Sequence, residues 1–289
     1  MAASSYITIG SGLASSYVLC RSMGYAVGHV HSVFDSCLNV LIEDELIHVG
    51  ALSKGLSCLG FAVDDDSMVE LTRQAHVGDR VVVAGDVLRI YTDDAVSSIP
   101  FKFFTPVSTL ISPHSDGFDP STLALELSLL ELERRTGIVP DAQMQSTAEV
   151  LASPDASIDD LRASMNYLIG RGAGLTPSGD DLLVGYGVAR HLLKRAETFC
   201  HVLSECLTHA STTDVSRAYL KAISKGYANH SYLELADSAI SRDGRGIARA
   251  LDTLLKVGHT SGADGLLGFA LGIGLNLLAS RPVAAYGGG

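Results

Sequence analysis

The first hundred residues contain short apolar runs in which β-branched side chains alternate with polar ones. Gly, Asp and Ser separate these runs, as is typical of strands joined by tight turns. The segment 80–91 reads as two strands around the turn Ala84-Gly85-Asp86. The pattern predicts a small β-barrel or sandwich with room for one helix, and its strands include residues 16–20, 29–42, 45–52, 80–91 and 98–104.

From Ser121 onward the apolar residues recur at helical spacing. The segment 122–137 follows this spacing and ends at Gly137, a residue that commonly terminates a helix. Three prolines (106, 113 and 120) mark a linker before it. We therefore expect an α+β chain with a β-rich N-terminal domain at 1–112 and an all-α bundle at 113–289. The further helices are expected at about 157–169, 178–195, 197–209, 213–225, 230–241, 245–256 and 262–280.

One phrase, Ser-Gly-x-Asp-x-Leu-x-Gly, occurs twice in the helical part. Each residue of the second copy lies 83 positions after its counterpart, and each copy directly precedes an apolar-periodic run. We therefore expect two helix starts related by a pseudo-two-fold axis. The copies are Ser178, Gly179, Asp181, Leu183, Gly185 and Ser261, Gly262, Asp264, Leu266, Gly268.

The repeated phrase has two interpretations. If Ser178 is the N-cap, Asp181 falls three residues later, as in a capping box, and Ser261 with Asp264 repeats the arrangement. Alternatively, the two helix starts face each other, and their free N–H groups and positive dipole ends bind an anion. The hydroxyls of Thr176 and its neighbours would then add donors, and loop glycines such as Gly174 would let the backbone approach the ligand.

The carboxylates at these helix starts complicate an anion site. Asp180, Asp181 and Asp264 would repel an anion unless they cap a helix, accept N–H groups of the ligand or bind a cation. Adjacent helical residues point about 100° apart, so Asp180 and Asp181 are expected to serve different purposes. A Mg²⁺ ion could be held here, since hard cations take carboxylate oxygens, although the ligand set is thin.

The composition of the chain limits the kinds of molecule that it is expected to bind. The 289 residues are 47% hydrophobic and carry a formal charge of −11 without a basic tract, which disfavours nucleic acid and anionic membranes. The five cysteines form no Cys-x-x-Cys pair and are odd in number, which argues against a disulfide framework or a zinc knuckle. No segment resembles a signal peptide or a membrane span, so we expect a cytoplasmic protein.

Other candidates lie outside the repeated phrase. Thr212 and Thr213 stand at another expected helix start, where they either cap it or donate to the same pocket. Arg171 could pair with a carboxylate or phosphate, or lie on the surface. His29 and His31 share a face of an expected strand and could ligate a metal, although alternation alone would place them so. His259 is the better acid–base candidate because it adjoins the second copy.

The motif from Gly170 to Asp181, Gly-x-Gly-x-Gly-Leu-Thr-Pro-Ser-Gly-Asp-Asp, resembles the hallmark of a bacterial family known as a domain of unknown function. The likeness extends to His31-Ser-Val-Phe with Asn39, to Thr212-Thr213 with Ser216, and to Gly258-His-Thr-Ser-Gly-x-Asp264. Members of this family include the AllH-type subunit of oxamate carbamoyltransferase, from anaerobic allantoin degradation in purine catabolism. The resemblance implies a three-component enzyme that splits oxalurate with phosphate into oxamate and carbamoyl phosphate.

The resemblance implies an FdrA-like protein and another large subunit as partners, and the chain could also associate with itself. The resulting hypothesis is a carbamoyltransferase subunit that binds a small anion (oxalurate, oxamate, phosphate or carbamoyl phosphate) at the paired helix starts. Two alternatives stay open: a metal-dependent hydrolase of a small amide or phosphoester, and a non-catalytic subunit of a complex. The expected catalytic residues are Asp181, Asp264 and His259, and no residue is expected as a metal ligand. The expected substrate-binding residues are Arg171, Gly174, Thr176, Ser178, Gly179, Asp180, Thr212, Thr213, Thr260, Ser261 and Gly262.

Overall fold

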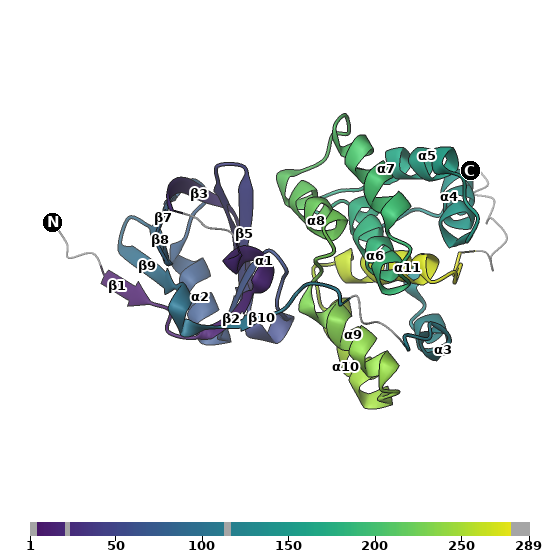
Figure 1. Ribbon diagram of the computed structural model, residues 1–289. Helices are drawn as coiled ribbons and strands as arrows, with labels where there is room; N and C mark the ends of the chain where they lie inside the picture. The colour runs from purple at the N-terminus through teal and green to yellow at the C-terminus, as the bar shows by residue number, and fades with distance from the viewer. Residues whose placement is uncertain (1–4, 21–23, 113–116, 279–289) are drawn as a thin grey trace, which may run out of the picture. The chain divides into compact units, whose positions relative to one another are not determined.

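A computed structural model describes residues 5–20, 24–112 and 117–278 (Figure 1). The chain divides into two compact units, residues 1–110 with 227–231 and residues 111–226 with 232–289. The first is built on one β-sheet and the second is helical, which confirms the predicted α+β class. No helix in the described ranges is both long and apolar enough to cross a membrane.

The first unit is a ten-stranded sheet that curls around one helix (Figure 1). Its order is β1-β9-β8-β7-β3-β4-β5-β6-β2-β10, so β1 and β10 are edges and the sheet is a half-barrel. Neighbours pair antiparallel except β1–β9, β5–β6 and β10–β2. The strands are β1 (Ser5–Thr8), β2 (Gly12–Ser15), β3 (Tyr25–Phe34), β4 (Cys37–Ile42), β5 (Glu45–Ala51), β6 (Gly60–Val63), β7 (Arg80–Ala84), β8 (Val87–Tyr91), β9 (Ala95–Pro100) and β10 (Phe104–Val107).

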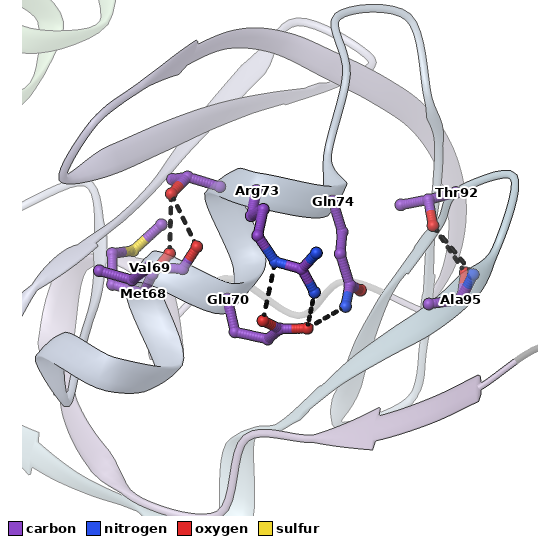
Figure 2. Close-up of polar contacts among 8 residues, drawn as sticks. Met68, Val69, Glu70, Arg73, Gln74, Thr92 and Ala95 are labelled. Atoms are coloured by element: carbon purple, nitrogen blue, oxygen red, sulfur yellow. Dashed lines mark hydrogen bonds and ion pairs between the residues drawn. The ribbon is translucent and has the colours of Figure 1, made fainter.

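Helix α2 (Asp65–Gln74) packs its apolar face into this curl. Met68 and Leu71 are almost fully buried there against the sheet's hydrophobic core. Figure 2 shows its outer face, where the Glu70 carboxylate accepts two hydrogen bonds from the Arg73 guanidinium at 2.7 and 3.1 Å. Because that ion pair is solvent-exposed it adds little stability, so the helix is held mainly by its buried face.

The second unit is a bundle of helices around the pair α6 and α11 (Figure 1). A segment at 227–231 leaves it and joins the sheet unit, where the Asn229 side chain accepts from the Cys58 N–H at 3.0 Å. The helices are α3 (Ser121–Leu129), α4 (Ala142–Ala152), α5 (Ile158–Leu168), α6 (Ser178–Leu192), α7 (Glu197–Leu207), α8 (Asp214–Ser224), α9 (His230–Ile240), α10 (Gly244–Leu255) and α11 (Ser261–Gly272).

Several predicted elements were wrong. Residues 16–20 were expected as a strand but form the short helix α1 (Ser16–Leu19), because the Ser15 side chain accepts the Tyr17 N–H and starts a helical turn. The helix expected at 122–137 ends at Leu129, since Glu131 takes a left-handed conformation with φ 48°. The last helix ends at Gly272 rather than residue 280, and Gly274 follows it with φ +89°. Helix α4 was not predicted at all.

Candidate functional site

Helices α6 and α11 pack backbone to backbone through glycines of the repeated phrase. A Cβ atom added to Gly185 would overlap the carbonyl oxygen of Gly265, and one added to Gly268 would overlap that of Leu182. These two contacts map onto each other under the 83-residue shift, so the helix pair is pseudo-symmetric. Only residues without side chains allow this approach.

The starts of the two helices lie side by side. The hydroxyls of Thr176 and Ser261 are hydrogen-bonded at 2.9 Å, although 85 positions separate them in the sequence. Further along, a Cβ on Gly272 would lie 2.6 Å from that of Ala189, so the helices run in the same general direction. Their positive dipole ends therefore meet at the same place.

The expected capping boxes are wrong. Ser178 and Ser261 are the first residues of their helices, and the N-cap residues Pro177 and Thr260 make no side-chain cap. Backbone carbonyls of the preceding loops satisfy the helix starts instead. The Gly179 N–H donates to the Arg171 carbonyl at 2.8 Å, and its counterpart on Gly262 donates to the Val257 carbonyl at 3.1 Å. The amides of Gly179 and Gly262, expected as anion donors, are therefore already hydrogen-bonded.

A third segment, Thr136–Gly137, closes over the paired helix starts. The Thr136 hydroxyl and the Gly137 N–H both donate to the Asp264 carboxylate, the latter at 2.9 Å. A Cβ on Gly137 would overlap the Ser178 hydroxyl and lie 3.0 Å from that of Thr260. Gly137 therefore serves close packing at this site, whereas its sequence context suggested only a helix end.

Two carboxylates lie inside this arrangement. Asp264 is 0% exposed and Asp181 is partly buried. In both, the Oδ2 atom is enclosed and has no hydrogen-bond partner among the described residues. Burial raises the pKa of Asp181, the Ser261 and Thr176 hydroxyls oppose the shift, and the charge of Asp264 adds to it, so that the pKa is about 8. Asp181 therefore holds a proton at neutral pH.

Tyr232 of α9 is a member of this cluster that sequence reasoning missed. Its side chain is 5% exposed, and its hydroxyl lies so close to Gly265 that a Cβ there would overlap it. Burial raises the pKa of Tyr232, and so do the charges of Asp181 and Asp264. The main-chain carbonyl of Asp181 also lies next to Gly265, so the hydroxyl reaches the backbone that carries both carboxylates. No motif marks Tyr232, because only the packing of α9 against the helix pair brings it here.

Asp180, Thr212 and Thr213 form a second set that supports the loop. The Asp180 carboxylate is buried and accepts from the Gly170 N–H at 2.9 Å and from the Thr212 hydroxyl at 2.5 Å. Thr213 caps α8 and donates to the Leu175 carbonyl at 2.5 Å. These side chains fasten the loop 170–177 to the start of α8.

The remaining expected residues form no hydrogen bond or ion pair with Asp181 or Asp264 among the described residues. Arg171 pairs with Asp141 at 2.9 Å and lies over the Tyr167 ring at 4.2 Å from its centroid. Gly174 is exposed with φ +89°. His259 is exposed on the loop before α11.

The described residues offer little to a metal ion. Within the described ranges, no group of three or more His, Cys, Asp or Glu side chains could hold a metal ion. In the sheet unit, an irregularity in β3 between Val30 and Ser32 interrupts the alternation from which a shared face of His29 and His31 was expected.

Comparison with known protein families covers both units. The family described as oxamate carbamoyltransferase subunit AllH matches residues 168–273, a range that contains both copies of the repeated phrase. The AllH family N-terminal domain matches residues 7–99. No solved structure matches the chain. Since the two matches together cover more than half of the sequence and follow in order, the chain belongs to the AllH family.

Proposed function

We propose that this chain is the AllH-type subunit of an oxamate carbamoyltransferase, and that the paired starts of α6 and α11 hold the small substrate during carbamoyl transfer. The observation that carries the proposal is the meeting of the two copies of the repeated phrase. It encloses the Oδ2 atoms of Asp181 and Asp264 beside the hydrogen-bonded hydroxyls of Thr176 and Ser261. A merely structural helix pair would not need two enclosed carboxylate oxygens without partners.

The charge balance at the helix starts supports binding of a small polar anion. Each helix N-terminus carries roughly half a positive charge, so two together offset about one negative charge. Because Asp181 is protonated at neutral pH, it adds no second charge to that of Asp264. The hydroxyls of Ser178 and Thr260, which lie around Gly137, could donate to a carboxylate or phosphoryl oxygen.

The reaction also needs a proton at this place. When a phosphate oxygen forms its bond to the carbamoyl carbon of oxalurate, the carbon–nitrogen bond breaks, and the departing nitrogen takes a proton to become the amide of oxamate. Asp181 carries such a proton near neutral pH, and the proton of the attacking hydrogen phosphate restores it. His259, which is exposed, could exchange protons with solvent at the edge of the site.

The name of the family implies other subunits, and we propose an FdrA-like protein and a further large subunit as partners in the allantoin pathway. We also propose a cytoplasmic location. The absence of a disulfide among the five described cysteines supports it, because thiols stay reduced in that compartment.

The test is phosphate-dependent turnover by the complex reconstituted with those partners. Carbamoyl phosphate formed from oxalurate is measured for the wild type, for Ser178→Ala with Asp181→Ala, and for the control Asp252→Asn, an exposed carboxylate paired with Lys256. We expect the double variant to lose turnover while its circular dichroism spectrum is unchanged, and the control to keep it. Undiminished turnover in the double variant would refute the site. Splitting of oxalurate without phosphate and blocked by a chelator would instead indicate a metal-dependent hydrolase.

A further inference from the structure

Three polar groups from three helices converge beside the glycine contact of α6 and α11. Asp181 and Asp264 each present an enclosed Oδ2 atom with no partner among the described residues. The Tyr232 hydroxyl lies against Gly265 between the two helices and forms no hydrogen bond to another described residue. Enclosed carboxylate oxygens without partners are costly, so the retention of these two points to a ligand that satisfies them.

The chemistry of the three groups defines their complement. The buried phenol stays protonated, because burial and both carboxylates raise the pKa of Tyr232, so it is a donor. The Asp264 carboxylate is an acceptor, and the carbonyl oxygen of the protonated Asp181 carboxyl is another. Their complement is a group with one carbonyl oxygen and N–H donors beside it, which is a primary amide or ureido group. A second carboxylate in its place would bring no N–H donors and would be repelled by the charge of Asp264.

We propose that Tyr232, Asp181 and Asp264 form a subsite for the amide end of the substrate, in which the Tyr232 hydroxyl donates to the amide carbonyl and the two carboxyl groups accept its N–H hydrogens. This inference rests on the proposed function for the identity of the substrate, and it assigns Tyr232 a binding role. The anionic end of the same substrate would then point toward the hydroxyls at the helix starts.

The test compares two ligands of nearly equal size. Oxamate carries an amide and a carboxylate, whereas oxalate carries two carboxylates. Isothermal titration of the full chain should show oxamate binding at least about tenfold more tightly than oxalate. Tyr232→Phe should remove about tenfold of the affinity for oxamate, the effect of one lost hydrogen bond, and leave that for oxalate unchanged.

Tyr186→Phe is the matched control. Tyr186, in α6, is buried like Tyr232, but its ring packs against that of Phe199, with 5.5 Å between the ring centroids. It should leave both affinities unchanged. A second readout needs no ligand: the melting temperature of Tyr232→Phe should equal or exceed that of the wild type, because a hydroxyl without a partner adds no stability. A fall of several degrees would show that the hydroxyl is structural and would overturn the proposal.

Equal affinity for oxamate and oxalate, unchanged oxamate binding in Tyr232→Phe, or binding of neither ligand would each overturn the subsite. The proposed function fails separately. A chain that distinguishes the two ligands through Tyr232, in a complex that makes no carbamoyl phosphate, would keep the subsite and lose the transferase. If the complex makes carbamoyl phosphate and Tyr232→Phe changes neither its activity nor its affinity for oxamate, the transferase function stands and the subsite is refuted.

Discussion

Replacing Asp181 with asparagine should stabilise the chain at neutral pH. Burial raises the pKa of this carboxyl from 3.8 to about 8. Between these values the folded chain keeps a proton that the unfolded chain has released, so the free energy of unfolding falls as the pH rises through this window and levels off above pH 8. Asparagine has nearly the same shape as a protonated aspartate and carries no such cost.

The size of the effect follows from that window. The free energy of unfolding of the wild type should fall, relative to Asp181→Asn, by about 1.4 kcal/mol for each pH unit. This amounts to at most about 4 kcal/mol at pH 7, an upper limit because part of the Asp181 side chain meets solvent. The gain in stability should accompany a loss of turnover, as expected when a functional group is buried at a cost.

The assay is urea unfolding followed by circular dichroism at about 222 nm, which reports the helical unit, at several pH values between about 5 and 8. The control is Asp252→Asn, whose exposed ion pair with Lys256 should matter by less than about 0.5 kcal/mol at every pH. If the difference between wild type and Asp181→Asn stays constant over this range, the carboxyl is ionised throughout and the reasoning about the buried pair is wrong.

Three further variants test the packing around the site. Gly268→Ala should lower the free energy of unfolding by about 2–3 kcal/mol, because the added Cβ overlaps the Leu182 carbonyl and neither backbone can yield. The control Gly244→Ala has open space around it and should be neutral, and the denaturant midpoints of the two variants test this. Asp180→Ala should lower the free energy of unfolding by about 2 kcal/mol, because it leaves the Gly170 amide and the Thr212 hydroxyl without their acceptor. It should also speed limited proteolysis of the loop 170–177, and an unchanged cleavage rate would contradict this. Arg171→Ala should change the free energy of unfolding by less than about 1 kcal/mol and kcat/KM by less than about twofold, since the ion pair of Arg171 with Asp141 is partly exposed. A large rise in KM would show that Arg171 contacts the substrate.

Local patterns predicted much of the fold. The hairpin of β7 and β8 turns at Gly85 as expected, because the turn is encoded by its own residues. Helix α5 begins within one residue of its expected start, since Ser157 caps it. Helix α4 was missed because its sequence, rich in Gln, Ser and Thr, has a weak apolar stripe. The strand expected at 16–20 failed because one serine cap outweighed the strand propensity of its apolar residues.

Of the candidate site, the sequence predicted mainly the part that the repeated phrase encodes. The two copies of the phrase identified the helix starts and both carboxylates, and the structure brings them together. Hydrogen bonds between segments could not be foreseen, so the contacts through which Asp180 supports the loop 170–177 had no signal in the sequence. Thr136 and Tyr232 were not identified because they reach the carboxylates through long-range packing, for which no local pattern exists.

The measurement that tests the central claim most directly is a double-mutant cycle on carbamoyl phosphate formation, with Asp181→Asn, Asp264→Asn and both together in the reconstituted complex. If the two copies of the phrase form one substrate site, each single variant should lower kcat/KM at least about tenfold, and the double variant should be little worse than the poorer single one. Wild-type activity in both single variants, or losses that simply multiply in the double variant, would show that the two carboxylates do not act on one substrate.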